Sequence, residues 1–174
     1  MGVMRKVVLV LVSAASAVAM GAASGAGAAP GAGAASGAGV PGKNAAAVEA
    51  DLAHHGHVSL SGGHLVVLLG SENHGPSGLA DATVRLDFSA PVAAGQALPP
   101  TCLWGGDRTV LCRTGLLRPI GRGSELTLDL RTTGRPDEIV VRIDTAWNGG
   151  ADDLNLENHR HRVLAPDTGD RYAF

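Results

Sequence analysis

The chain has 174 residues, enough for one domain with a single hydrophobic core. Aromatic residues make up only 3% of it, so this core must be built mainly from Leu, Val and Ile. Loss of Arg5 and Lys6 with an N-terminal leader would leave 12 of the 14 basic residues against 16 acidic ones. The resulting net charge of −4 argues against nucleic-acid binding.

The first 19 residues have the pattern of a signal peptide. Arg5 and Lys6 supply a positive n-region, residues 7–12 form an apolar run, and Ala17-Val18-Ala19 is a small-x-small cleavage motif. The apolar run is much shorter than the ~20 residues that span a bilayer, so we interpret it as a leader rather than an anchor. We therefore expect a secreted protein, extracellular or associated with the cell wall, with no membrane span in the mature chain.

Residues 20–50 are expected to form a disordered linker. From residue 21 to residue 42 the chain is almost wholly Ala, Gly, Ser and Pro and carries no charge. Such a segment buries too little apolar surface to offset the entropy lost on ordering. A poly-alanine helix is the alternative, but the frequent glycines each weaken a helix by ~1 kcal/mol relative to Ala. The folded domain is accordingly placed at residues 51–174.

Beyond residue 58 the apolar residues recur with a period of two, which predicts strands with one buried face. These strands are expected near residues 58–60, 65–69, 84–88, 126–130, 139–143 and 162–165. The run 65–69 is continuously apolar and suits a strand buried deep in a sandwich. Clusters of Gly, Asn, Pro and Ser between the strands predict turns. About seven or eight short strands favour an all-β antiparallel sandwich, because a single open sheet would leave one apolar face in water.

Cys102 and Cys112 are the only cysteines, and an even count in an exported chain predicts a disulfide. A hairpin that reverses at residues 105–109 would set Trp104 opposite Val110 and bring the two sulfurs together. The spacing excludes a C-x-x-C redox pair, and two cysteines alone do not form a zinc site.

Several motifs together resemble a known family. They are Asn73-His74-Gly75-Pro76-Ser77, the strand 82–88, Cys102, Val110-Leu111-Cys112, Gly115-Leu116-Leu117, Gly121, the strand 124–130 and the Asp/Asn-rich segment 153–158. Their order is similar to that of the Ig-like conserved-repeat module of bacterial surface and secreted proteins, known as domain of unknown function eleven. The resemblance covers about residues 55–165. It implies an Ig-like sandwich in an envelope-associated bacterial protein and supplies no catalytic residue.

The histidines give a first metal-binding hypothesis. His55 and His57 would share one face of a strand and could bind zinc or copper if His64 or an acidic residue completed the site. The structural alternative is a polar, solvent-exposed first strand that includes His54. We favour this alternative because no third ligand is fixed by the spacing.

Acidic residues give a second hypothesis. Asp152, Asp153, Asn155 and Glu157 offer oxygen atoms of the kind that calcium binds, but their spacing is not that of an EF-hand. A hydrophilic loop that caps one end of a sandwich is the alternative, and we favour it because Asp and Asn also stabilise turns. We predict no cofactor.

No catalytic motif is present: the sequence lacks Gly-x-Ser-x-Gly, His-Glu-x-x-His and the glycine loops that bind phosphates or dinucleotides. The sequence therefore favours a non-enzymatic Ig-like module for adhesion, scaffolding or protein interaction. One alternative is a carbohydrate-binding domain that uses Trp104 and Trp147. Another is a protease inhibitor that presents the disulfide-closed hairpin. The partner would be an extracellular protein or glycan.

Overall fold

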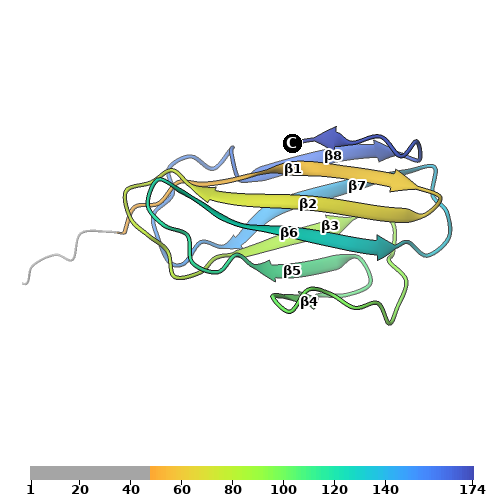
Figure 1. Cartoon of the computed structure of the whole chain (residues 1–174), viewed down its shortest axis with the longest axis horizontal. Coiled ribbons are helices and arrows are strands. Elements are labelled where there is room, and N and C mark those ends of the chain that lie inside the picture. The colour runs from red at the N-terminus through yellow and green to blue at the C-terminus, as the bar shows by residue number, and fades with distance from the viewer. Residues whose placement is uncertain (1–47) are drawn as a thin grey trace, which may run out of the picture. The chain divides into compact units, whose positions relative to one another are not determined.

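The computed structural model describes residues 48–174, which form nine β-strands and no helix (Figure 1). The strands are β1 (Leu52–Ser61), β2 (His64–Asn73), β3 (Thr83–Phe88), β4 (Cys102–Trp104), β5 (Thr109–Arg113), β6 (Gly121–Arg131), β7 (Glu138–Trp147), β8 (Arg160–Pro166) and β9 (Tyr172–Ala173). The predicted signal peptide (1–19) and most of the predicted linker (20–50) lie outside the described residues. Within residues 48–174 no helix is long and apolar enough to cross a membrane.

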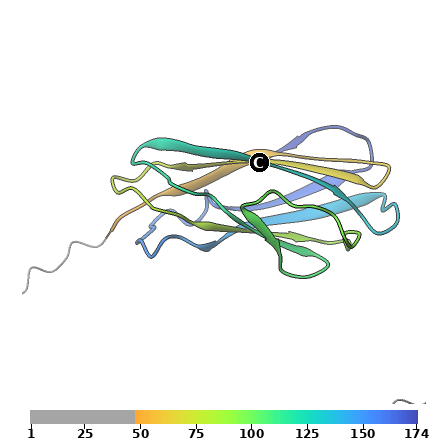
Figure 2. The ribbon, with the colours of Figure 1, turned by 60° about the horizontal axis from the view of Figure 1, so that its bottom comes forward.

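The strands form two antiparallel sheets that face each other as the two layers of a sandwich (Figure 2). One sheet has the order β6-β2-β1-β9 and the other the order β4-β5-β3-β7-β8. The all-β prediction is confirmed. The strand number differs from the predicted seven or eight, because the short β9 near the C-terminus pairs with β1 at His57 and Val58.

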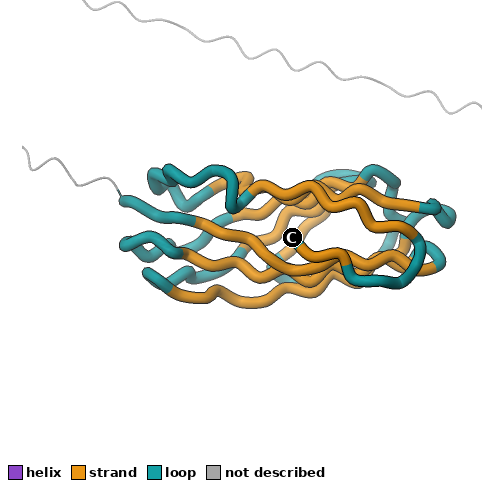
Figure 3. Tube along the Cα trace, turned by 90° about the horizontal axis from the view of Figure 1, so that it is seen from above, coloured by secondary structure: helices purple, strands orange, loops and turns teal. Residues whose placement is uncertain are grey.

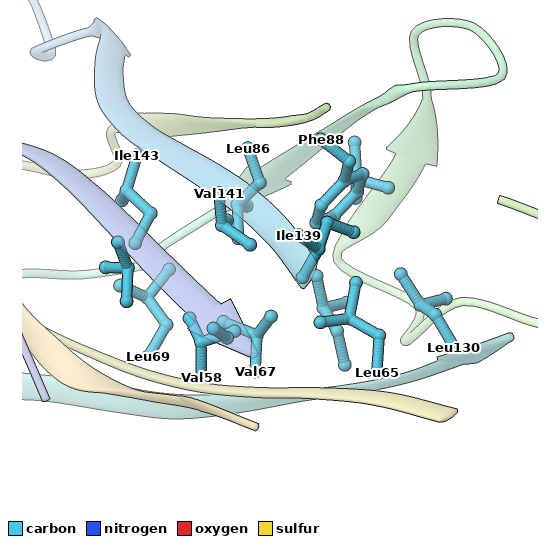
Figure 4. Packing of buried hydrophobic residues seen from close by; sticks show 14 of the residues in the cluster. Val58, Leu65, Val67, Leu69, Leu86, Phe88, Leu130, Ile139, Val141 and Ile143 are labelled. Carbon is cyan, nitrogen blue, oxygen red and sulfur yellow. The ribbon is translucent and has the colours of Figure 1, made fainter. Parts of the chain in front are cut away.

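The core lies between the sheets and is almost entirely aliphatic (Figure 4). Side chains of β1, β2 and β6 point towards those of β3 and β7, and the buried positions alternate along each strand as the period of two requires. In β2, Leu65 and Val67 are buried but Val66 is half-buried. The continuous apolar run is therefore not buried on both faces, because a two-layer sandwich covers only one face of each sheet.

The predicted hairpin is confirmed with its register. Cys102 and Cys112 are joined by a disulfide and lie directly opposite each other in β4 and β5, as do Trp104 and Val110. Closing a loop of this length contributes about 3 kcal/mol to stability in the chain-entropy model. The bond fixes the short edge strand β4 to the rest of its sheet.

Loops gather at the two ends of the strands (Figure 3). We call one of these ends the loop end; it consists of residues 48–51, 74–82, 114–120 and 148–159. These segments meet because β2 ends opposite the start of β6, and β7 ends opposite the start of β3. In Figure 1 the loop end is on the left, where β1 begins.

Candidate functional site

Asn73 organises the first segment of the loop end. Its side chain is fully buried, and its Oδ1 accepts hydrogen bonds from the backbone N–H of Asp51 (3.2 Å) and Gly75 (3.0 Å). Its Nδ2 donates to the carbonyl of Ser77 (2.7 Å). A Cβ on Gly75 would lie 2.6 Å from the Cα of Ala50, so only glycine allows this close approach. The Asn-His-Gly-Pro-Ser motif therefore has a structural role, tying the turn after β2 to the chain before β1.

A second, smaller apolar cluster lies beneath the loop end. It consists of Ala50, Leu52, Leu79, Ala82, Leu117 and Ala151, all buried, with at least one residue from each segment of this end. Leu79 and Leu117 also exchange two backbone hydrogen bonds, at 2.8 and 2.9 Å. The loops are therefore held together by their own small core.

The prediction of a polar, solvent-exposed first strand is wrong for His54. It is only 3% exposed and lies on the core face of β1 with Leu52 and Val58. Its Nδ1 is 3.0 Å from the hydroxyl of Ser71, and its Nε2 is 2.9 Å from the hydroxyl of Thr145 on the facing sheet. The imidazole thus links the two sheets. Burial, followed by the nearby histidines, lowers the pKa of His54 to about 3.

Asp153 and His159 extend this buried polar region. The Asp153 side chain is buried, and its Oδ2 accepts a hydrogen bond from the backbone of Leu52 (3.0 Å) and lies 3.9 Å from Nε2 of His159. Its Oδ1 accepts a hydrogen bond from the backbone of Asn155 (3.0 Å). His159 is also buried, with its ring edge-on to that of His54 at 6.4 Å. The carboxylate of Asp153 therefore serves to fix the loop 148–159 against β1.

The structure does not assemble either of the metal sites considered from the sequence. His55 and His57 share the outer face of β1, but His55 lies 3.8 Å from Glu72, and His64 contacts Asp129 on β6. Asp152 and Glu157 are both exposed in the loop 148–159. Across residues 48–174, no three His, Cys, Asp or Glu side chains come close enough to hold a metal ion.

The two tryptophans do not share a site. Trp104 is half-buried and packs against the core, and its remaining surface lines a cleft of about 280 Å³ with Val92 and Asp107. Trp147 is 51% exposed and ends β7 beside the loop end. The tip of the β4–β5 hairpin is fastened by backbone hydrogen bonds from Phe88 and Val92. Residues 105–108 at this tip are exposed, so the hairpin is held in place and accessible.

Exposed apolar side chains concentrate at the loop end. Of the eight large exposed apolar residues in the described part of the chain, six lie in it or directly beside it: Val48, Leu116, Ile120, Trp147, Leu154 and Leu156. Leu154 is 87% exposed and Ile120 is 81% exposed. Scattered single apolar residues on a surface are ordinary, but six of the eight at one end of the sandwich make this end the candidate site. Sequence reasoning missed this site, although its apolar residues stand among Gly, Pro, Asn and Asp.

Ile120 is also conformationally unusual. Its φ is 48°, in the left-handed region that β-branched residues rarely adopt, and it is the only non-glycine residue of positive φ in residues 48–174. Its backbone N–H donates to the carbonyl of Gly75 (3.3 Å), which fixes it to the neighbouring loop. The backbone of Ile120 is therefore strained while its side chain is 81% exposed.

Comparisons with known proteins add little. No family model matches the chain, and no curated protein matches it. Among solved structures, it is similar to β-glucosidase 3B from Thermotoga neapolitana, seen in complexes with α-D-glucose, with glycerol and with glucose. The TM-score is 0.43 and the identity 16%, over 72% of this chain and 17% of the other. At this TM-score the similarity carries no argument.

Proposed function

We propose that this chain is a secreted, non-enzymatic Ig-like module that binds a protein partner through its loop end, in adhesion or scaffolding outside the cell. The observation that carries this proposal is the concentration of exposed apolar side chains on loops that a buried cluster and Asn73 hold in place. Loops positioned by a rigid sandwich are a common location for binding residues.

The strand orders support the Ig-like part of the proposal. In Ig-like sandwiches the first, second and fifth of the seven main strands share one sheet, and the third, sixth and seventh share the other. If β4, β5 and β9 are set aside, β6-β2-β1 and β3-β7-β8 follow the same order. The loop end then corresponds to the end of the sandwich that carries the antigen-binding loops in antibody variable domains.

A non-catalytic role is supported by the burial and the low basicity of the group of residues that most resembles a catalytic triad. Ser71, His54 and Thr145 form a hydrogen-bonded chain, but His54 is only 3% exposed and Ser71 only 4%. With a pKa of about 3, His54 is also a poor general base near neutral pH. The third member is a hydroxyl rather than the carboxylate that orients the histidine of a catalytic triad.

The partner is expected to be a protein, because protein interfaces combine exposed apolar side chains at their centre with a polar rim. Trp147 and the leucines of the loop 148–159 provide the apolar part, and Asp152 and Glu157 stand beside them. Trp is also among the residue types that contribute most binding energy at interfaces.

The proposal is tested by affinity capture from the host's secreted and envelope fractions. An affinity tag inserted within residues 20–42 leaves all described strands and the loop end intact. The test variant replaces Leu116, Ile120 and Leu154 by Ser, and the control replaces Leu103 and Leu164, which are exposed on strands outside the loop end. We expect a protein that the wild type and the control retain and the test variant loses. Equal retention by all three forms, or no retained protein, would contradict the proposal.

A further inference from the structure

We infer that the protein partner of the loop end is a second copy of this chain, bound end to end about a two-fold axis. This inference rests on the proposed function and names a single partner for the loop end. It is carried by the opposite charges of the two apolar loops at this end.

One of these loops is basic. Residues 114–122 contain Arg118 and Arg122 and no acidic residue, together with the exposed Leu116 and Ile120. Arg122 lies 3.2 Å from Glu72, which is held in its charged form because a hydrogen bond from His74 and the charge of Arg122 lower its pKa. Arg118 is exposed and has no carboxylate within 4.0 Å in the described residues.

The other loop is acidic. Residues 148–158 contain Asp152, Asp153 and Glu157 and no basic residue, together with the exposed Leu154 and Leu156. Asp153 is buried and engaged with His159, but Asp152 and Glu157 are exposed. Neither has a basic group within 4.0 Å in the part of the chain that the structure describes. Glu49, paired with Asp152 through a backbone bridge, adds a further exposed carboxylate.

The two loops lie at opposite sides of the loop end. Residues 114–120 connect β5 to β6, which adjoin along one edge of the sandwich around a cleft lined by Cys112 and Leu126. Residues 148–159 connect β7 to β8, and β8 contacts β1 at the other edge. A two-fold axis through the middle of the loop end, perpendicular both to the strands and to the line that joins the two loops, would therefore set each basic loop on the partner's acidic loop.

Such an interface is self-complementary, as a two-fold symmetric dimer requires. The basic loop of each copy would contact the acidic loop of the other, and the exposed apolar side chains of both loops would be buried between them. Because the dimer has two such contacts, Arg118 of each copy would lie beside a carboxylate of the other. A partner with a uniformly acidic or a uniformly basic surface would suit only one of the two loops. A second copy suits both.

The test is a charge exchange measured by sedimentation equilibrium and native mass spectrometry on the mature chain. Arg118→Glu sets a carboxylate against the partner's Asp152 and Glu157, and Asp152→Arg with Glu157→Arg sets two guanidinium groups against the partner's Arg118. The three side chains are exposed, so these changes are not expected to disturb folding. Arg135→Glu, an exposed charge reversal between β6 and β7 at the far end, is the matched control.

We expect the wild type and the control to form dimers that weaken as salt is raised, since exposed charges are screened. Each loop variant alone should dissociate at least about tenfold more readily, because two attractions become two repulsions. An equimolar mixture of the two loop variants should form a heterodimer, because both contacts then regain opposite charges. The mass difference between the variants identifies the heterodimer directly.

A monomeric wild type at all concentrations, or a dimer indifferent to both reversals, would overturn the inference. So would two weakened variants that form no heterodimer when mixed. If the capture experiment still finds a different protein that is lost with the loop-end variant, the second copy is wrong and the proposed function stands. If neither experiment detects binding, both are wrong.

Discussion

Lowering the pH from 7 to 5 should destabilise the folded domain by about 2 kcal/mol, because the unfolded chain then binds a proton at His54 while the folded sandwich keeps this side chain neutral. The pKa of its imidazole is about 3 in the folded protein, against 6.5 for an ordinary histidine. Between these values the unfolded chain binds the proton more readily, so stability is complete above pH 6.5 and falls as the pH decreases. The loss is about 1.4 kcal/mol per pH unit, which gives the stated value at pH 5.

The charged groups near His54 also lower its pKa, as burial does. After burial, the largest contributions to its lowered pKa are the charges of His159, His161 and His55. The buried carboxylate of Asp153 lies 3.9 Å from Nε2 of His159, and no carboxylate is paired with His54 in the described residues. The hydroxyls of Ser71 and Thr145 can serve as donor or acceptor, so they satisfy the neutral ring without compensating a positive charge.

The assay is urea unfolding at pH 7 and pH 5, followed by circular dichroism. The His54→Gln variant cannot titrate at this position and should lose much less stability between the two pH values, although it starts from a lower stability. His57→Gln changes a histidine on the outer face of the same strand and should keep the wild-type pH dependence. If the wild type loses under about 0.5 kcal/mol, or if His54→Gln retains the full loss, the assignment of this proton to His54 is refuted.

Three further predictions concern the same domain. Asn73→Ala should lower the free energy of unfolding by about 2 to 4 kcal/mol, since it leaves buried backbone groups without partners, whereas the exposed Asn155→Ala should change it little. Replacing Cys102 and Cys112 together by Ala should cost about 3 kcal/mol and leave the circular dichroism spectrum of a β-sandwich at low temperature. Gly75→Ala should lower the melting temperature by at least about 4 °C, because its Cβ would meet the backbone of the segment before β1. If one of these three variants melts like the wild type, the interaction that it removes or disturbs does not stabilise the domain as we predict.

The sandwich could be predicted from the sequence because its signals are local and repeat along the chain. The alternation over residues 126–130 and 139–143 predicts strands that the structure contains within β6 and β7. The register of the hairpin followed from the spacing of Cys102 and Cys112, since antiparallel pairing leaves one way to bring the sulfurs together. In contrast, the two residues of β9 are too few to show a period, and their pairing with β1 depends on the completed fold.

The buried histidine could have been found from the sequence, but the exposed apolar surface could not. Counting back by twos from Val58 puts His54 on the core face with Leu52, and only the apparent polarity of the segment hid this. The exposure of Leu116 and Leu154 depends on which loops meet at one end of the sandwich. The residues next to them in the sequence do not indicate which loops these are. Leu117 illustrates the difficulty, since it is adjacent to Leu116 and completely buried.

The two ends of the sandwich differ in a way that favours binding at the loop end. At the far end, the tip of the β4–β5 hairpin is fastened by backbone hydrogen bonds, but its residues 105–108 are glycines and charges. At the loop end, Asn73 and the cluster around Leu117 fix the loops while leucine, isoleucine and tryptophan side chains stay exposed. Ordering flexible loops reduces affinity, so loops already held by buried contacts retain more of the free energy gained from apolar contact. The buried cluster therefore holds the exposed loops of this end in place. Replacing Leu117 by alanine should reduce partner binding, although the Leu117 side chain is completely buried and cannot contact a partner.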